Sequence, residues 1–334
     1  MANQLEAFPP RFAFLRSKSS QLFNVLRIRA IDLLLFRHVL LSSSVPGALQ
    51  FGPAMYSVAA VFIWGASDFT GGFATRRANP FVLTTLSHLS ALAMMTGVAL
   101  AGHQALPDRT SIGWALLAGS LGGFSLALFY RALASGRMGL TAPIAALLGA
   151  AIPTMVDIAL KGAPSRWSLL GFVLAVIAIW LITRPEPADG PPDANVEFGR
   201  PKGVGTAALA GVGFAGFYLC IHQASGSPAS VAAISRLGSL TMTMIAVLVT
   251  RANPKLDAPR IALGMLAGFL DISGTALFVY ANQHGRLDEA VVITSLYPAV
   301  TVLLARIVLR EHFSRWKFVG LLAALASVPL IAGG

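Results

Sequence analysis

The chain has 334 residues, of which 55% are hydrophobic and only 12% charged, and its formal net charge is +11. A soluble domain carries about 25% charged residues and cannot bury so much apolar surface at this length, so the composition excludes an ordinary soluble domain and predicts a membrane protein. The scattered Lys and Arg favour membrane-orientation charges over a nucleic-acid surface, and the single cysteine, Cys220, excludes an intrachain disulfide.

Residues 1–54 are basic, with six Lys or Arg. The apolar run 21–41 contains Arg27, Arg29, Asp32 and Arg37. Each central charge costs about 2.5–3.5 kcal/mol in an inserted helix, so this run is not expected to be a span. It is interpreted as a basic interfacial helix or a signal-like segment, unless the native protein starts at Met55 and the extension is a start-site artefact.

Ten later runs have the roughly 20 apolar residues that a spanning helix needs. They are 56–75, 80–102, 111–132, 140–160, 167–184, 204–222, 229–249, 260–281, 289–309 and 316–333. Residues 185–203 are rich in Pro and acidic residues, as is typical of a solvated linker. The linker divides the spans into two units of five, over 56–184 and 204–333.

The two units are related in sequence. A shift of 149 residues without gaps places 112–182 over 261–331, and a shift of 148 aligns the earlier helices. The first shift superposes Gly136-Arg137 on Gly285-Arg286. Because each copy has an odd number of spans, the second must enter the membrane from the opposite side. The sequence therefore predicts an all-α polytopic fold of ten transmembrane helices in two inverted five-helix repeats, with a substrate site between them.

Acidic residues are rare within the spans. Asp68 is interpreted as a carboxylate that exchanges a proton for substrate, and the alternative is a structural cap or ion pair. Asp271 is interpreted as facing the cavity or as a buried hydrogen-bonding group. Asp157 and Arg306 are repeat-equivalent, and a structural ion pair between them is predicted.

Two further groups are candidates for substrate binding or coupling. His88 and Arg236 occupy equivalent positions in the two copies. In the functional interpretation, each of these two side chains pairs with a carboxylate or binds an anionic substrate. The alternative for His88 is a core residue that is hydrogen-bonded to backbone carbonyls. Tyr297, next to Pro298, is placed on the cavity. Trp64 is interpreted as a stacking or hydrogen-bonding group for the substrate, and the alternative is a place in an interfacial aromatic belt. Gly119 and Gly123, like Gly264 and Gly268, are spaced for close helix packing. Prolines at 143, 153 and 298 are expected to interrupt spans four and nine.

A resemblance to a known family is carried by the two five-helix halves, by Trp64-Gly65 in the first span and by the Gly-Arg turns after spans three and eight. In these features the chain resembles the EamA-type family of the drug/metabolite transporter superfamily. The resemblance implies ten helices, inverted repeats, alternating access, and export or uptake of small metabolites. The chain departs from the family pattern at Lys161-Gly162, where a Gly-Glu pair is common, and at His88. The two halves are therefore expected to be functionally unequal.

The function predicted is a secondary transporter that moves a small metabolite by alternating access, with a proton as the candidate coupling ion. The alternative is a membrane scaffold or lipid-handling protein without transport. No enzymatic activity and no metal or nucleotide cofactor is expected, because the sequence has no catalytic cluster, metal-binding motif or nucleotide-binding motif. The expected partners are the substrate, protons and lipids of the inner or plasma membrane, without nucleic acid, and the chain is expected to act as a monomer or homodimer.

The membrane orientation of the chain is not decided by its charges. The Lys and Arg of the connections favour one orientation and those of the extension favour the opposite one, so both orientations stay open.

Overall fold

The computed structural model describes residues 52–134, 138–183, 203–309 and 314–332, and every regular element in these ranges is an α-helix. The residues of the basic extension before Gly52 and nearly all of the predicted linker lie outside the described residues. The helices agree with the predicted spans to within a few residues. They are α3 (Gly52–Thr75), α4 (Pro80–Ala101), α5 (Arg109–Ala134), α6 (Met138–Lys161), α7 (Arg166–Thr183), α8 (Val204–His222), α9 (Pro228–Val249), α10 (Ala258–His284), α11 (Leu287–Thr294), α12 (Tyr297–Leu309) and α13 (Arg315–Ala332).

Corresponding helices of the two copies begin and end in the same way. The side chains of Asn79 and Ser227 accept backbone hydrogen bonds in the first turns of α4 and α9, and each is followed by a proline. Such caps satisfy donors that have no partner within the helix. After both helices the chain turns through the left-handed region, at His103 (φ 48°) and Arg251 (φ 47°). The repeat is therefore visible in the backbone as well as in the side chains.

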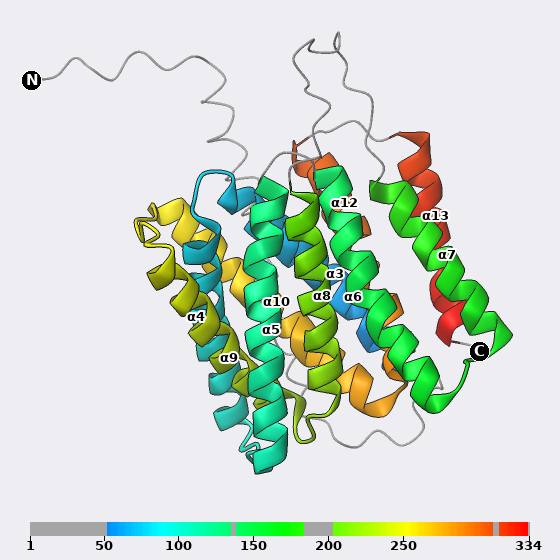
Figure 1. The fold of residues 1–334 in the computed structure, drawn as a ribbon, viewed down its shortest axis with the longest axis horizontal. Coiled ribbons are helices and arrows are strands. Elements are labelled where there is room, and N and C mark those ends of the chain that lie inside the picture. The colour runs from blue at the N-terminus through cyan, green and yellow to red at the C-terminus, as the bar shows by residue number, and fades with distance from the viewer. Residues whose placement is uncertain (1–51, 135–137, 184–202, 310–313, 333–334) are drawn as a thin grey trace, which may run out of the picture.

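The contacts between helices also follow the repeat, in which α3 corresponds to α8, α4 to α9 and α5 to α10. α3 packs against α10 as α8 packs against α5, and α4 packs against α10 as α9 packs against α5. The pair α4 and α9 and the pair α7 and α13 lie on opposite sides of the bundle (Figure 1). Ser168 near the start of α7 donates a hydrogen bond of 3.4 Å to the carbonyl of Ile331 near the end of α13. These two equivalent helices therefore run antiparallel.

The ninth predicted span is broken in two. α11 ends at Thr294 and α12 begins at Tyr297, with Ser295 and Leu296 between them. The interruption expected from Pro298 is therefore present, because a proline has no N–H to continue the ladder. By contrast, α6 continues past Pro153 without a break, so the interruption expected in span four is absent at that proline.

The glycine spacing produces close approaches between helix backbones. A Cβ built on Gly119 of α5 would lie 1.6 Å from the carbonyl oxygen of Ser235 in α9, and one on the equivalent Gly268 would lie 2.1 Å from that of Ser87 in α4. Ser239 Oγ donates to the Gly119 carbonyl at 2.8 Å across the first crossing. The predicted packing role of these glycines is confirmed, and it brings α9 and α4 against the centre of the bundle.

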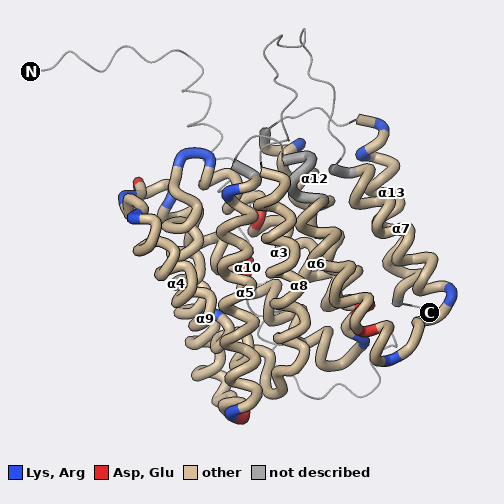
Figure 2. The backbone as a smooth tube through the Cα atoms, viewed as in Figure 1, with Lys and Arg blue, Asp and Glu red and all other residues tan. Residues whose placement is uncertain are grey.

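The outer surface suits a lipid environment. Large apolar side chains on α7 are exposed, including Leu170, Val173, Ile177 and Trp180, and such a patch is unfavourable in water. Figure 2 shows most charged residues at the two ends of the bundle. In the described ranges, seven segments are long and apolar enough to cross a membrane, namely Pro80–Ala101, Arg109–Ala132, Ile144–Lys161, Val204–His222, Pro228–Val249, Ala258–His284 and Leu287–Val308.

Candidate functional site

A cavity of about 60 Å³ lies where the two repeats meet. It has room for a few water molecules, and its lining combines aromatic rings with a few charged groups, as small-molecule sites commonly do. Both repeats contribute side chains. The lining residues are Trp64 and Asp68 of α3, Gly122 and Leu126 of α5, Phe214, Phe217 and Tyr218 of α8, Arg236 of α9, Asp271 and Thr275 of α10, and Tyr297 of α12.

One wall of the cavity is an ion pair between α9 and α10. Arg236 Nη1 lies 3.1 Å from Asp271 Oδ2, and Arg236 Nη2 donates to Thr275 Oγ1 at 2.5 Å. Thr275 Oγ1 in turn donates to the Asp271 carbonyl at 2.9 Å, and Trp64 Nε1 donates to the same carbonyl at 3.1 Å. The guanidinium is thus held by Asp271 and Thr275 of the second repeat, and Trp64 of the first repeat bonds to the backbone of the same helix. Arg236 Nε has no hydrogen-bond partner among the described residues.

The carboxylate of Asp68 has no such partner. It lines the cavity and is 8% exposed. Among the described residues no side chain donates a hydrogen bond to it or forms an ion pair with it, and its charged neighbour is the carboxylate of Asp271. A buried carboxylate without compensation is costly unless it takes up a proton or another cation. The lining thus holds two carboxylates and one guanidinium.

His88 lies beside this site and does not line the cavity. Its side chain is fully buried on α4, close enough to Arg236 for their charges to interact. The Gly123 backbone is nearby, but neither ring nitrogen makes a well-formed hydrogen bond within the described part of the chain. The Gly123 backbone is the polar group nearest to hydrogen-bonding with the ring, so the backbone-bonded core histidine weighed above also stays a prediction. A coupling role for His88 stays a prediction.

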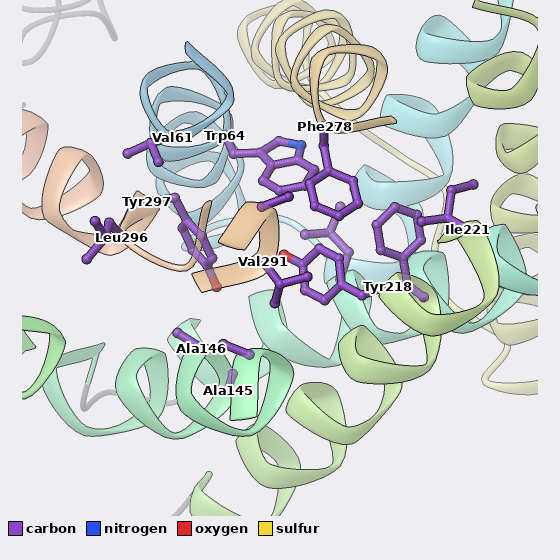
Figure 3. Packing of buried hydrophobic residues seen from close by; sticks show 14 of the residues in the cluster. Val61, Trp64, Ala145, Ala146, Tyr218, Ile221, Phe278, Val291, Leu296 and Tyr297 are labelled. Atoms are coloured by element: carbon purple, nitrogen blue, oxygen red, sulfur yellow. The ribbon is translucent and has the colours of Figure 1, made fainter. Parts of the chain in front are cut away.

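Aromatic rings form a further part of the cavity lining. Figure 3 shows Trp64, Tyr218, Phe278 and Tyr297 converging from different helices around Val291. The ring centroid of Trp64 lies 6.2 Å from that of Tyr218 and 5.6 Å from that of Phe278, in tilted arrangements. Aromatic pairs prefer such geometry to face-to-face stacking. Tyr297 lines the cavity as predicted, and Trp64 lies on the cavity rather than in an aromatic belt at the surface.

Comparison with known families identifies the fold. A model of the EamA-like transporter family matches twice, over residues 52–184 and 201–333. The chain belongs to the EamA-like transporter family. The resemblance expected from the sequence is confirmed, and the protein is a multi-pass membrane transporter of the drug/metabolite transporter superfamily. Members of this family are transporters rather than enzymes.

Solved structures share this architecture. Among 26 matching chains, one described as a crystal structure of a protein has a TM-score of 0.64 and 15% sequence identity, and the match covers 84% of this chain and 97% of that chain. At this identity the likeness shows the fold alone. No curated protein matches the chain.

The ion pair predicted between Asp157 and Arg306 of this EamA-like transporter needs correction. Asp157 Oδ1 lies 3.0 Å from Lys161 Nζ, and Asp157 Oδ2 accepts a hydrogen bond from the Asp288 backbone N–H at 3.1 Å. Asp157 therefore sits at the start of the broken ninth span, whereas Arg306 lies in the last turn of α12. Inverted repeats place equivalent positions near helix ends at opposite ends of the bundle, so the structure does not bring the two together.

Several lining residues were not singled out from sequence. Thr275 lies one helical turn after Asp271, a spacing at which side chains share a helix face. This spacing was the signal available for Thr275. Phe214, Phe217, Gly122 and Leu126 resemble ordinary core residues in sequence, and only their position beside the ion pair distinguishes them.

Proposed function

We propose that this EamA-like transporter moves a small metabolite by alternating access, with substrate bound between the repeats and a proton as the coupling ion. It works in the inner or plasma membrane, surrounded by lipid, as a monomer or homodimer and without a nucleic-acid partner. The single observation that carries the proposal is the uncompensated carboxylate of Asp68 in a cavity lined by both repeats. Intramembrane carboxylates of this kind commonly mark proton or substrate pathways.

The proposed topology is ten membrane spans in two inverted repeats. Seven segments meet the length and hydropathy requirements of a span, and α11 and α12 together form one of them. We propose that α3 also crosses the membrane, because it is the counterpart of α8, and α8 meets the length and hydropathy requirements. α7 and α13 pack together as an antiparallel pair, and α7 presents large apolar side chains outward. Rocking of one repeat against the other about the cavity is the motion that such symmetry favours.

Asp68 is the proposed coupling group. The Arg236 guanidinium is engaged by Asp271 and Thr275, so it is not free to neutralise the second carboxylate. A proton or a bound substrate then completes the charge balance of the site. The titratable groups facing Asp68 are Tyr130 of α5, Tyr218 of α8, Arg236 of α9, Asp271 of α10 and Tyr297 of α12, with His88 of α4 behind Arg236.

Asp68→Asn is expected to abolish proton-driven transport. Asparagine has the shape of the aspartate but binds no proton at neutral pH, so uptake of labelled amines, amino acids or sugars into proteoliposomes under a pH gradient should fall to the level of empty liposomes. The thermal unfolding temperature in detergent should stay close to that of the parent.

The matched control is Asp108→Asn, in the connection before α5. The pKa of Asp108 lies below its usual range because Ser111 donates a side-chain hydrogen bond to it. The residue is therefore charged at neutral pH but lies outside the cavity, and its variant should transport normally. Normal gradient-driven uptake by Asp68→Asn would remove Asp68 from the mechanism. Absence of uptake by the parent for all classes of compound would favour the scaffold or lipid-handling alternative.

A further inference from the structure

We infer that the cavity takes a small organic monocation, an amine or ammonium group, which binds against Asp68 in place of a proton. This inference rests on the proposed transport function and names the substrate class of the same site. It follows from the charges of the lining and from the aromatic surface beside them.

The charge balance selects a cation over a zwitterion or an anion. Asp271 and Arg236 form a neutral pair at 3.1 Å, and Asp68 in its ionised form adds one negative charge without a partner in the described structure. A monocation restores neutrality in a region of low dielectric, whereas a zwitterion leaves the extra charge in place and an anion doubles it. An anion bound at Arg236 would also have to displace Asp271.

The rings beside Asp68 supply the second element of cation recognition. Trp64 lies one helical turn before Asp68 on α3, so both side chains reach the same side of the helix. Tyr218, Phe217 and Tyr297 complete the aromatic part of the lining. Ammonium groups bind over the faces of Trp and Tyr, and clusters of such rings recognise alkylated ammonium ligands. The volume of about 60 Å³ suits a small head group rather than a bulky substrate.

Competition at one carboxylate fixes the direction of the pH dependence. Bound cation and bound proton exclude each other at Asp68, so lowering the pH must weaken cation binding. Below the pH at which Asp68 titrates, the apparent affinity should fall about tenfold per pH unit, and above that pH it should be constant. The other titratable groups that face this carboxylate are Tyr130, Tyr218, Arg236, Asp271 and Tyr297.

The test uses three ligands of nearly equal shape and different charge, namely choline, neutral 3,3-dimethyl-1-butanol and zwitterionic glycine betaine, with tetramethylammonium as a second cation. Equilibrium binding to the purified full-length protein in detergent is measured by calorimetry at several pH values. We expect the two cations to bind, with the pH dependence above, and the neutral and zwitterionic compounds to bind at least tenfold more weakly. Asp68→Asn should lose cation binding at least tenfold, and Asp108→Asn should leave it unchanged.

Equal binding of choline and its neutral isostere would overturn the inference, as would preference for glycine betaine or absence of binding by both cations. Flux in proteoliposomes separates this inference from the transport proposal. Cations that bind at Asp68 without being moved would support the ligand class and contradict transport. Movement of zwitterions or neutral solutes by a protein that binds neither cation would support transport and contradict the ligand class.

Discussion

Gly119→Ala is expected to destabilise the protein by at least about 3 kcal/mol, the upper part of the range for overpacked cores. The new Cβ would lie 1.6 Å from the carbonyl oxygen and 2.9 Å from the Cα of Ser235. These are backbone atoms of a packed helix, so no rotamer change can relieve the clash and α5 must move away from α9. The separation would also lengthen the hydrogen bond from Ser239 to the Gly119 carbonyl. Thermal unfolding in detergent measures the loss.

The same helix offers a matched control. A Cβ on Gly113 meets nothing within 4 Å, and alanine has a higher helix propensity than glycine. Gly113→Ala should therefore keep or slightly raise the unfolding temperature. The equivalent Gly268→Ala, whose Cβ would lie 2.1 Å from the Ser87 carbonyl oxygen, should resemble Gly119→Ala. Equal unfolding temperatures for Gly119→Ala and Gly113→Ala would contradict the close helix crossing.

Asp271→Asn is expected to cost about 3 kcal/mol, because the substitution removes the carboxylate that lies within ion-pair distance of the buried Arg236 guanidinium. Arg236 would keep its hydrogen bond to Thr275 but lose the carboxylate at 3.1 Å. The double variant Asp271→Asn/Arg236→Gln should be more stable than the sum of the two single effects predicts. A double-mutant cycle built on thermal unfolding measures this coupling.

An exposed ion pair at the start of the same helix provides the control. Asp257 Oδ2 lies 2.7 Å from Arg260 Nη1, with the Asp257 side chain exposed and that of Arg260 partly exposed, and such surface pairs contribute at most about 1 kcal/mol. Asparagine preserves the N-cap that Asp257 forms. Asp257→Asn should therefore have little effect. If Asp257→Asn lowered the free energy of unfolding as much as Asp271→Asn, burial would not determine how much an ion pair contributes to stability.

The two repeats contribute unequally to the site. The second repeat supplies the ion pair and most of the aromatic lining, whereas the first supplies Asp68 and Trp64. At equivalent positions near the centre of the bundle, His88 is fully buried outside the cavity and Arg236 lines it. This difference agrees with the functional inequality that the sequence departures led us to expect.

Repetition of the sequence was sufficient to predict the helices and the family, because apolar length and internal similarity are properties of the chain itself. The same reasoning selected Asp68, His88, Arg236, Asp271, Trp64 and Tyr297, since charged and aromatic side chains at membrane depth are rare enough to stand out without coordinates. All of these except His88 line the cavity.

The tertiary structure alone decided which of these groups are partners. Sequence symmetry related Asp157 to Arg306, but the fold pairs Asp157 with Lys161 and Arg236 with Asp271. A repeat specifies which positions are equivalent and leaves open which of them meet, because only side chains close to the pseudo-symmetry axis come together. The close crossings at Gly119 and Gly268 bring α9 against α5 and α4 against α10, and only this packing shows that Asp68 has no ion-pair partner among the described residues.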